Sequence, residues 1–338
     1  MFHIPGGDDL LRIIKMATAI VAGVALSSCA TAPRGPAGRL ADAGIKATAS
    51  FSSDTSALST HVAAGGVTEA FVERWQLCKA QPALCGTPLT TDPNFQLRQD
   101  LAAAILLRAK ALTALNQAYA ALKQEAEYDA RADMTGAVNE AVSGVNSFAS
   151  VAFRLAQAPI PANIGALIGV ASGIFGDQNQ RQRILGANTK LREIAQRLHD
   201  ALAAEAAVFD RIADPIEMRR AEALAALFDE GLIDGAELIK PMTESLGVTL
   251  ASGSGAKIAA SPALKAATSD LIRAQAQVET ARVRARYRAS LAALQALVVE
   301  HDNLAAKRSV SLAEVARLLA EVNAALDTIP DAAATPTK

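Results

Sequence analysis

Apolar residues recur at every third or fourth position along most of the chain, which is the spacing of α-helices that bury one face. The longest stripe without a proline covers residues 95–155. Asp92 is placed as its N-cap, with Pro93 at the first helical position. An unbroken helix of this length would extend about 90 Å, and Gly136 and Gly144 are the positions at which it is expected to weaken.

Shorter stripes predict further helices on both sides of this segment. Their expected ranges are 40–78 with a break at Gly65-Gly66, 177–213 up to Pro215, 216–229, 234–246, and 262–307 starting with Pro262. Leu264, Leu271 and Val278 are expected on the buried face of the last of these helices. The Gly- and Ser-rich residues 247–261 predict a loop or a short hairpin.

A capping box, formed by Ser311 and Glu314, marks the start of one more helix. The polar residues 330–338 predict a disordered tail. No segment has the alternating period of a strand. The chain is therefore predicted to be all-α, with residues 39–329 forming one elongated bundle of long, antiparallel, coiled-coil-like helices.

The composition agrees with slender, closely packed helices. Hydrophobic residues make up 51% of the chain but aromatic residues only 4%, which favours helices over an all-β fold. The formal net charge of −1 provides no electrostatic footprint for nucleic acid, and no nucleic-acid partner is expected. Arg282, Arg284, Arg286 and Arg288 are spread around one helix near Glu279 and are interpreted as a solvated face.

The N-terminal residues have the organisation of a secretory signal. Arg12 and Lys15 precede an uncharged run over residues 16–26, and Ser27 and Ser28 follow it. This run is too short to span a bilayer, which needs roughly 20 apolar residues.

The four residues Leu26-Ser27-Ser28-Cys29 resemble the lipobox of bacterial lipoproteins. The resemblance implies that residues 1–28 are removed and that Cys29 becomes the lipidated first residue of the mature protein. Ala30 stands where many family members retained in the inner membrane have Asp, which implies an outer-membrane lipoprotein facing the periplasm, with surface exposure left open. Residues 29–38 are then expected to form a tether. The alternative is an ordinary secretory signal cleaved in the small residues 30–32.

Cys78 and Cys85 are the two remaining cysteines, an even pair for an oxidising compartment. A turn at Pro82 brings them close, so a structural disulfide is expected, contributing about 2–3 kcal/mol in the chain-entropy view. The alternatives are a metal pair or a redox dithiol, but neither a CxxC spacing nor a neighbouring histidine supports them.

Residues 155–176 contain no charged side chain, and Gly165, Gly169 and Gly173 form a GxxxGxxxG ladder within them. Such a ladder lets another backbone approach closely. It is expected either to pack at a helix crossing in the core or to insert into a membrane or mediate oligomerisation. The prolines at 159 and 161 leave fewer helical residues than a bilayer span requires, which favours core packing. Long helices around an apolar segment also resemble the arrangement of cytolysin A-like pore-forming toxins, which implies membrane insertion as the alternative function.

The sequence lacks the GxSxG elbow, the P-loop and the Rossmann fingerprint of common enzymes. His61, His199 and His301 occur without metal-ligand spacing and are interpreted as exposed helix residues. Carboxylates such as Glu125 cannot be matched to an opposing partner from sequence. No catalysis, cofactor, metal or small-molecule substrate is expected. The predicted function is a structural or protein-interaction role, through a protein partner or a homo-oligomer.

Overall fold

The computed structural model describes residues 33–86, 93–128, 133–156, 179–245 and 247–327, and these residues contain helices and turns but no strand. The helices are α2 (Arg34–Ala80), η1 (Pro82–Leu84), α3 (Pro93–Tyr128), α4 (Met134–Ala156), α5 (Gln180–Asp229), α6 (Gly235–Ser245), α7 (Ser254–Ala260), α8 (Pro262–Ala305) and α9 (Ala313–Asp327). The prediction of an all-α, elongated bundle is confirmed.

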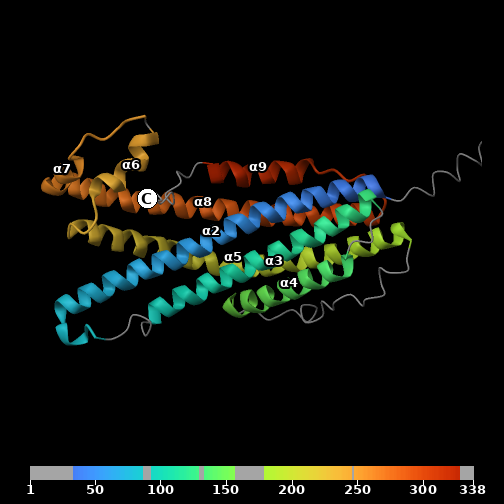
Figure 1. The fold of residues 1–338 in the computed structure, drawn as a ribbon, viewed down its shortest axis with the longest axis horizontal. Helices are drawn as coiled ribbons and strands as arrows, with labels where there is room; N and C mark the ends of the chain where they lie inside the picture. The colour runs from blue at the N-terminus through green and yellow to red at the C-terminus, as the bar shows by residue number, and fades with distance from the viewer. Residues whose placement is uncertain (1–32, 87–92, 129–132, 157–178, 246, 328–338) are drawn as a thin grey trace, which may run out of the picture.

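Four long helices, α2, α3, α5 and α8, run along the length of the bundle (Figure 1). Three pairs of sequence neighbours run in opposite directions: α3 returns along α2, α4 along α3, and α9 along α8. Helix α5, by contrast, runs in the same direction as α4. We call the end at which α2 begins, at Arg34, the base, and the end at which it stops, at Ala80, the tip. Helices α4 and α9 cover the base half, whereas α6 and α7 lie at the tip.

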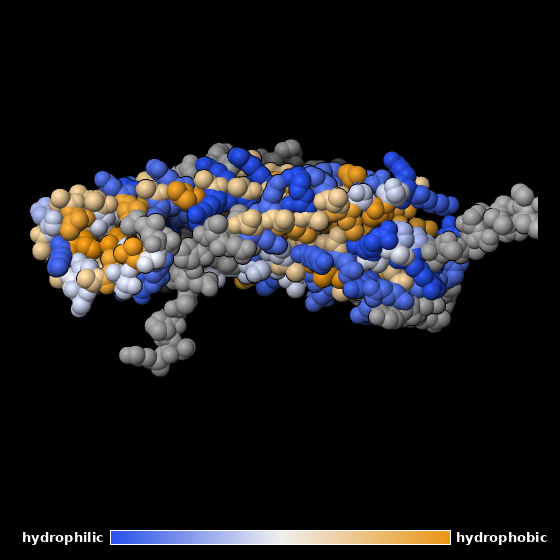
Figure 2. Space-filling model, turned by 90° about the horizontal axis from the view of Figure 1, so that it is seen from above, coloured by the Kyte–Doolittle hydropathy of each residue, from blue (hydrophilic) through white to orange (hydrophobic). Residues whose placement is uncertain are grey.

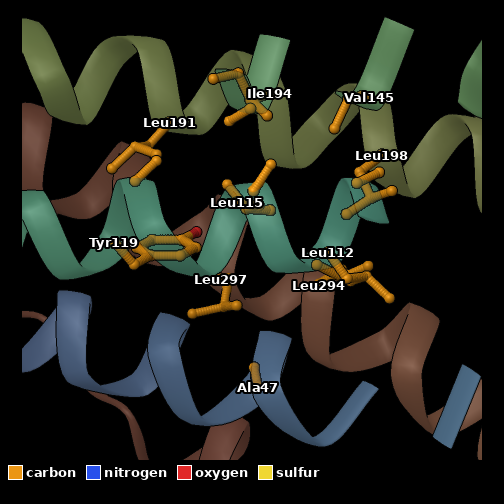
Figure 3. Close-up of a cluster of buried hydrophobic side chains, with 14 of the residues drawn as sticks. Ala47, Leu112, Leu115, Tyr119, Val145, Leu191, Ile194, Leu198, Leu294 and Leu297 are labelled. Carbon is orange, nitrogen blue, oxygen red and sulfur yellow. The ribbon is translucent and has the colours of Figure 1, made fainter. Parts of the chain in front are cut away.

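The base half contains one continuous hydrophobic core to which six helices contribute. Figure 3 shows Leu115 and Tyr119 of α3 between Leu191 of α5 and Leu297 of α8. All four side chains are fully buried, and burial of a large aliphatic side chain contributes about 1.5–3 kcal/mol. A Cβ atom at Gly44 of α2 would lie 2.5 Å from the Tyr119 ring. The absence of a side chain at Gly44 is therefore what lets α2 and α3 approach so closely.

Among the residues that the structure describes, the tip half has no continuous core. Its buried apolar residues form three small clusters, centred on Ile105, on Val72 with Leu227, and on Ile272. Other apolar side chains of this half, such as Leu264, remain about half exposed. In the space-filling view, hydrophobic residues reach the surface at the tip end (Figure 2). The tip therefore buries its apolar surface less completely than the base.

The predicted rod over residues 95–155 consists of two helices, α3 and α4. The Oδ1 atom of Asp133 accepts a hydrogen bond from the Gly136 N–H at 2.8 Å, so Asp133 caps the start of α4. Gly144, an expected weak point, lies inside α4, where its Cβ position is 3.3 Å from the Ala111 Cα. This glycine permits a close helix crossing and does not end a helix.

Two breaks predicted from glycine and proline do not occur. Helix α2 continues through Gly65 and Gly66, and a Cβ at Gly66 would lie 2.7 Å from the Arg98 Cβ, so this glycine too serves a close contact with α3. Helix α5 continues through Pro215, which removes one backbone hydrogen bond without ending the helix. The segments before and after the proline both pack against α8, the first in the base core and the second in a small cluster around Ile272.

The start of α8 agrees with the sequence: Ser261 Oγ accepts a hydrogen bond from the Leu264 N–H at 3.4 Å. The expected burial of this helix is wrong at two positions, because Leu264 and Val278 are 48% and 51% exposed. Helix α9 follows only the part of α8 nearest the base (Figure 1), and it packs in the base core, to which neither Leu264 nor Val278 belongs.

Three smaller expectations also differ from the structure. Residues 34–38, assigned to the tether, already belong to α2, and residues 254–260 form the short helix α7 within the expected loop. The capping box of α9 is wrong: the Ser311 N–H donates to the Glu300 carboxylate at 2.9 Å, whereas Glu314 pairs with Arg317.

Candidate functional site

The most unusual polar group in the base core is His301 of α8, which is fully buried. The expectation of an exposed histidine is wrong. The Oδ1 atom of Asn188 lies 2.7 Å from His301 Nδ1, and the Tyr119 hydroxyl lies 2.9 Å from Nε2. Because Oδ1 of an amide only accepts, Nδ1 carries the proton, and Nε2 accepts from the Tyr119 O–H. The Asn188 amide N–H also donates to the His301 backbone carbonyl at 3.0 Å.

This arrangement keeps His301 neutral. Burial lowers the pKa of His301 to about 3, and burial raises the pKa of Tyr119 above its ordinary value of 10. The two rings stack with centroids 5.7 Å apart. All hydrogen-bonding atoms of the imidazole are satisfied by groups on α3 and α5, so the residue links three helices.

A second polar cluster lies nearer the base end of the bundle. The Glu125 carboxylate accepts from Arg183 Nε at 2.9 Å and lies 2.8 Å from Nη2, which fixes α3 to the start of α5. The side chain of Gln180 donates to the Glu125 backbone carbonyl at 2.6 Å. Sequence alone gave Glu125 no partner, and the structure supplies one 58 positions away.

A third cluster lies at the boundary between the two halves. Arg108 Nη1 lies 2.7 Å from Glu205 Oε2, and the Tyr287 hydroxyl is 2.6 Å from the same oxygen. Burial opposes the charge on Arg108, but Glu205 outweighs it and raises the pKa of the guanidinium. Arg286 pairs nearby with Asp54 at 2.6 Å. Arg286 is therefore buried in an ion pair, which corrects the interpretation of a fully solvated arginine face.

A small cavity adjoins this cluster, with a volume of about 20 Å³, lined partly by Asp54, Arg108 and Tyr287. A space of this size accommodates about one water molecule. A fourth ion pair lies further toward the tip, where Arg98 Nη2 is 2.5 Å from Glu69 Oε2. Burial raises the pKa of Glu69 despite the opposing effect of Arg98.

The charges of these clusters are paired, although one guanidinium nitrogen each of Arg98, Arg108 and Arg286 is buried without a hydrogen-bond partner among the described residues. Each guanidinium faces a carboxylate from a different helix, and the neutral imidazole of His301 has both nitrogens occupied. Buried pairs of this kind contribute less to net stability than to fixing the register in which helices associate. The clusters therefore specify how α2, α3, α5 and α8 are aligned.

The residues predicted to carry function lie partly outside the described residues: Cys29, Gly165, Gly169 and Gly173 all do. Cys78 and Cys85 lie at the tip, at the end of α2 and after η1, as free thiols. A hydrogen bond with Cys85 raises the pKa of the Cys78 thiol, so the two sulfur atoms are neighbours. The disulfide stays a prediction.

Among the described residues, no helix is both long and apolar enough to cross a membrane. The same part of the chain contains no group of three or more His, Cys, Asp or Glu side chains arranged to hold a metal ion.

One signal for the buried pairs was available in the sequence. Arg108 lies three residues after Ile105 and four before Leu112, on the apolar stripe of α3, where a charge requires a buried partner. The identity of that partner, Glu205, could not be inferred, because 97 positions separate the two residues. The His301 cluster has no comparable signal.

Comparisons with known proteins do not identify the chain: no protein-family model, curated protein or solved structure matches it.

Proposed function

We propose that the protein is an outer-membrane lipoprotein, anchored through Cys29, whose helical bundle extends from the membrane and binds another protein. The observation that carries this proposal is the position of α2. It begins at Arg34, five positions after Cys29, and runs uninterrupted to Ala80. At 1.5 Å per residue, it separates the base from the tip by about 70 Å.

The distribution of buried groups supports a scaffold role. The base half, next to the proposed anchor, has the continuous core, and the buried ion pairs fix the alignment of the long helices. The tip is left with exposed apolar side chains, which often mark surfaces for a partner. A rigid stalk that presents its less covered end away from the membrane is the function that fits these features.

The anchor is tested by fractionating cells that produce the Cys29→Ala variant. The wild type is expected in the outer-membrane fraction, and the variant in the soluble periplasmic fraction, because it lacks the acylated thiol. Cys85→Ala is the matched control, since it also removes one thiol, and it should stay with the membrane. A Cys29→Ala protein that sediments with the outer membrane would overturn the proposal.

A further inference from the structure

A groove at the tip lies between the last turns of α2 and α5, with a volume of about 440 Å³. Trp75 and Lys79 line it from α2, and Ala226, Asp229 and Glu230 line it from the end of α5. We call it the tip groove. Trp75 is half-buried and packs against the cluster of Val72 and Leu227, so its indole is held in place at the groove wall.

The electrostatics of the tip groove favour a cation. Both α2 and α5 end here, at Ala80 and Asp229, and the C-terminal end of a helix carries a partial negative charge. The carboxylates of Asp229 and Glu230 add to it. Helix α5 has no basic residue in its last turn, and Asp229 has no ion-pair partner among the described residues. Lys265 of α8 approaches the Asp229 backbone carbonyl and does not line the groove.

The Lys79 ammonium already occupies a cation-binding position in the tip groove. Its Nζ atom lies 5.3 Å from the centroid of the Trp75 ring and 3.2 Å from Glu230 Oε1. The ammonium thus lies between an aromatic face and a carboxylate. The Lys79 side chain is 65% exposed, and ion pairs this exposed are weak and easily exchanged. A competing cation can therefore take its place.

A guanidinium fits this position better than the ammonium does. It is planar, stacks on tryptophan, is less strongly hydrated, and can bond a carboxylate through two N–H groups. Phe71 and Val67 lie four and eight positions before Trp75 on the same face of α2, and both are about half exposed. These two side chains form an exposed apolar strip on α2 beside the groove, which would contact apolar residues next to the cation.

We propose that the tip groove binds an arginine side chain of a partner protein, with the guanidinium on the Trp75 ring and bonded to Glu230 in place of Lys79. This binding specifies which side chain of the partner is recognised, and so it rests on the protein-interaction role proposed above. It does not depend on the lipid anchor. Arginine flanked by apolar residues is the recognised element, and Lys79 occupies its place while the partner is absent.

Trp75 is the only tryptophan of the chain, so the tryptophan fluorescence of the protein reports on this groove alone. The full-length protein is titrated with an acetylated, amidated Leu-Arg-Leu peptide and with the same peptide carrying citrulline in place of arginine. Citrulline keeps the shape but lacks the charge. We expect a saturable change in Trp75 emission with the arginine peptide, and binding at least about tenfold weaker with the citrulline peptide.

Two variants should act in opposite directions. Glu230→Gln removes the carboxylate and is expected to weaken binding about tenfold, whereas Lys79→Met removes the competing ammonium and is expected to tighten it about threefold. Glu237→Gln, at an exposed carboxylate of α6 outside the groove, is the matched control and should bind as the wild type does. Unchanged melting temperatures verify that the variants fold.

The proposal is overturned by any of three results: no saturable change in emission, equal binding of the two peptides, or weaker binding by Lys79→Met. Equal binding would reveal an apolar groove that does not select a cation. The titration is repeated with the Cys29→Ala variant to separate the two proposals. Its membrane release tests the anchor alone, and its peptide binding, which should equal that of the wild type, tests the groove alone.

Discussion

The base half of the bundle buries mainly aliphatic side chains beside the buried ion pair Glu125–Arg183, whereas the tip half relies on small clusters and on ion pairs between helices. Around Leu115 the base core is continuous, with α4 and α9 closing it. Toward the tip, Arg108–Glu205, Arg286–Asp54 and Arg98–Glu69 lie where the continuous core stops.

This difference implies two levels of stability in one molecule. Apolar burial is non-directional and favourable per unit area, whereas a buried ion pair must first offset the desolvation of both charges. The tip is therefore expected to open at a lower free energy than the base, and to be the part that adapts to a partner. Substitutions placed in the two halves test this difference in stability.

The largest expected effect is a cavity in the base core. Leu115→Ala should lower the free energy of unfolding by about 3–5 kcal/mol, because Leu115 is fully buried in the continuous base core, which cannot collapse into the cavity. Leu227→Ala, in a small tip cluster near the surface, is the matched substitution and should cost about 2 kcal/mol. Urea unfolding of both variants provides the comparison, and equal losses would contradict a continuous base core.

The next effect concerns the ion pair at the boundary. Arg108→Met leaves Glu205 buried without its cation and should lower the free energy of unfolding by about 3 kcal/mol. Replacing both partners, as Arg108→Met with Glu205→Leu, should recover most of the loss. Arg317→Met, at an exposed pair of α9, should have no measurable effect. If the double variant is no more stable than the single one, the pair contributes directly to stability and not chiefly to alignment.

The third effect is a dependence on pH in the base half. The pKa of His301 is about 3 in the folded protein, below its ordinary value of 6.5. As the pH falls below 6.5, the unfolded chain therefore gains a proton that the folded protein does not bind until about pH 3. Stability is lost across this window, by about 2–3 kcal/mol at pH 4.5.

Thermal unfolding of wild type and His301→Gln between pH 7 and pH 4 measures this loss. The variant lacks the titrating imidazole, so only the wild type should lose stability through this group. The amount by which the melting temperature of the wild type exceeds that of the variant should therefore decrease as the pH falls. Parallel pH profiles would mean that His301 is protonated within the folded protein.

The smallest effect is at the glycines of α2. Gly44→Ala should lower the free energy of unfolding by about 1–3 kcal/mol, because the new Cβ would overlap the buried Tyr119 ring. At Gly65 the nearest atom is the flexible Arg220 side chain at 3.4 Å, so Gly65→Ala should stabilise the helix by up to about 1 kcal/mol. Circular-dichroism melts compare the two, and destabilisation by both would show that the tip is packed as tightly as the base.

The helical stripes allowed most of the fold to be predicted, and the start of α8 at Pro262 was predicted to the residue. The helix breaks were predicted less well, because a glycine in a helix has two uses that look alike in sequence. Gly66 and Gly144 allow a neighbouring helix to approach, which depends on residues far away in the chain. Asp133, by contrast, is a local N-cap signal for α4 that is visible in the sequence but is not part of a helical stripe.

The candidate sites were predictable to a smaller extent. His301 followed by an acidic residue is typical of an exposed helix face, and only the folded bundle brings Asn188 and Tyr119 to it. The tip groove likewise exists only because α2 and α5 end next to each other. Neither helix end indicates a binding site in the sequence, so the groove could not be predicted. Periodicity predicts which face of a helix is buried, but it does not predict which other helix covers that face.

The contacts of α2 have a consequence for the speed of folding. Asp54 of α2 pairs with Arg286, which is 232 positions later, and Ser50 bonds Asn323 of α9. Contacts between residues so far apart in the chain form slowly, because the entropy of closing a long loop is lost before the contact stabilises the fold. Helix α2 can pair early with α3, but its other face is covered only when α8 and α9 have folded onto it. The first helix that the structure describes is therefore among the last to be completed.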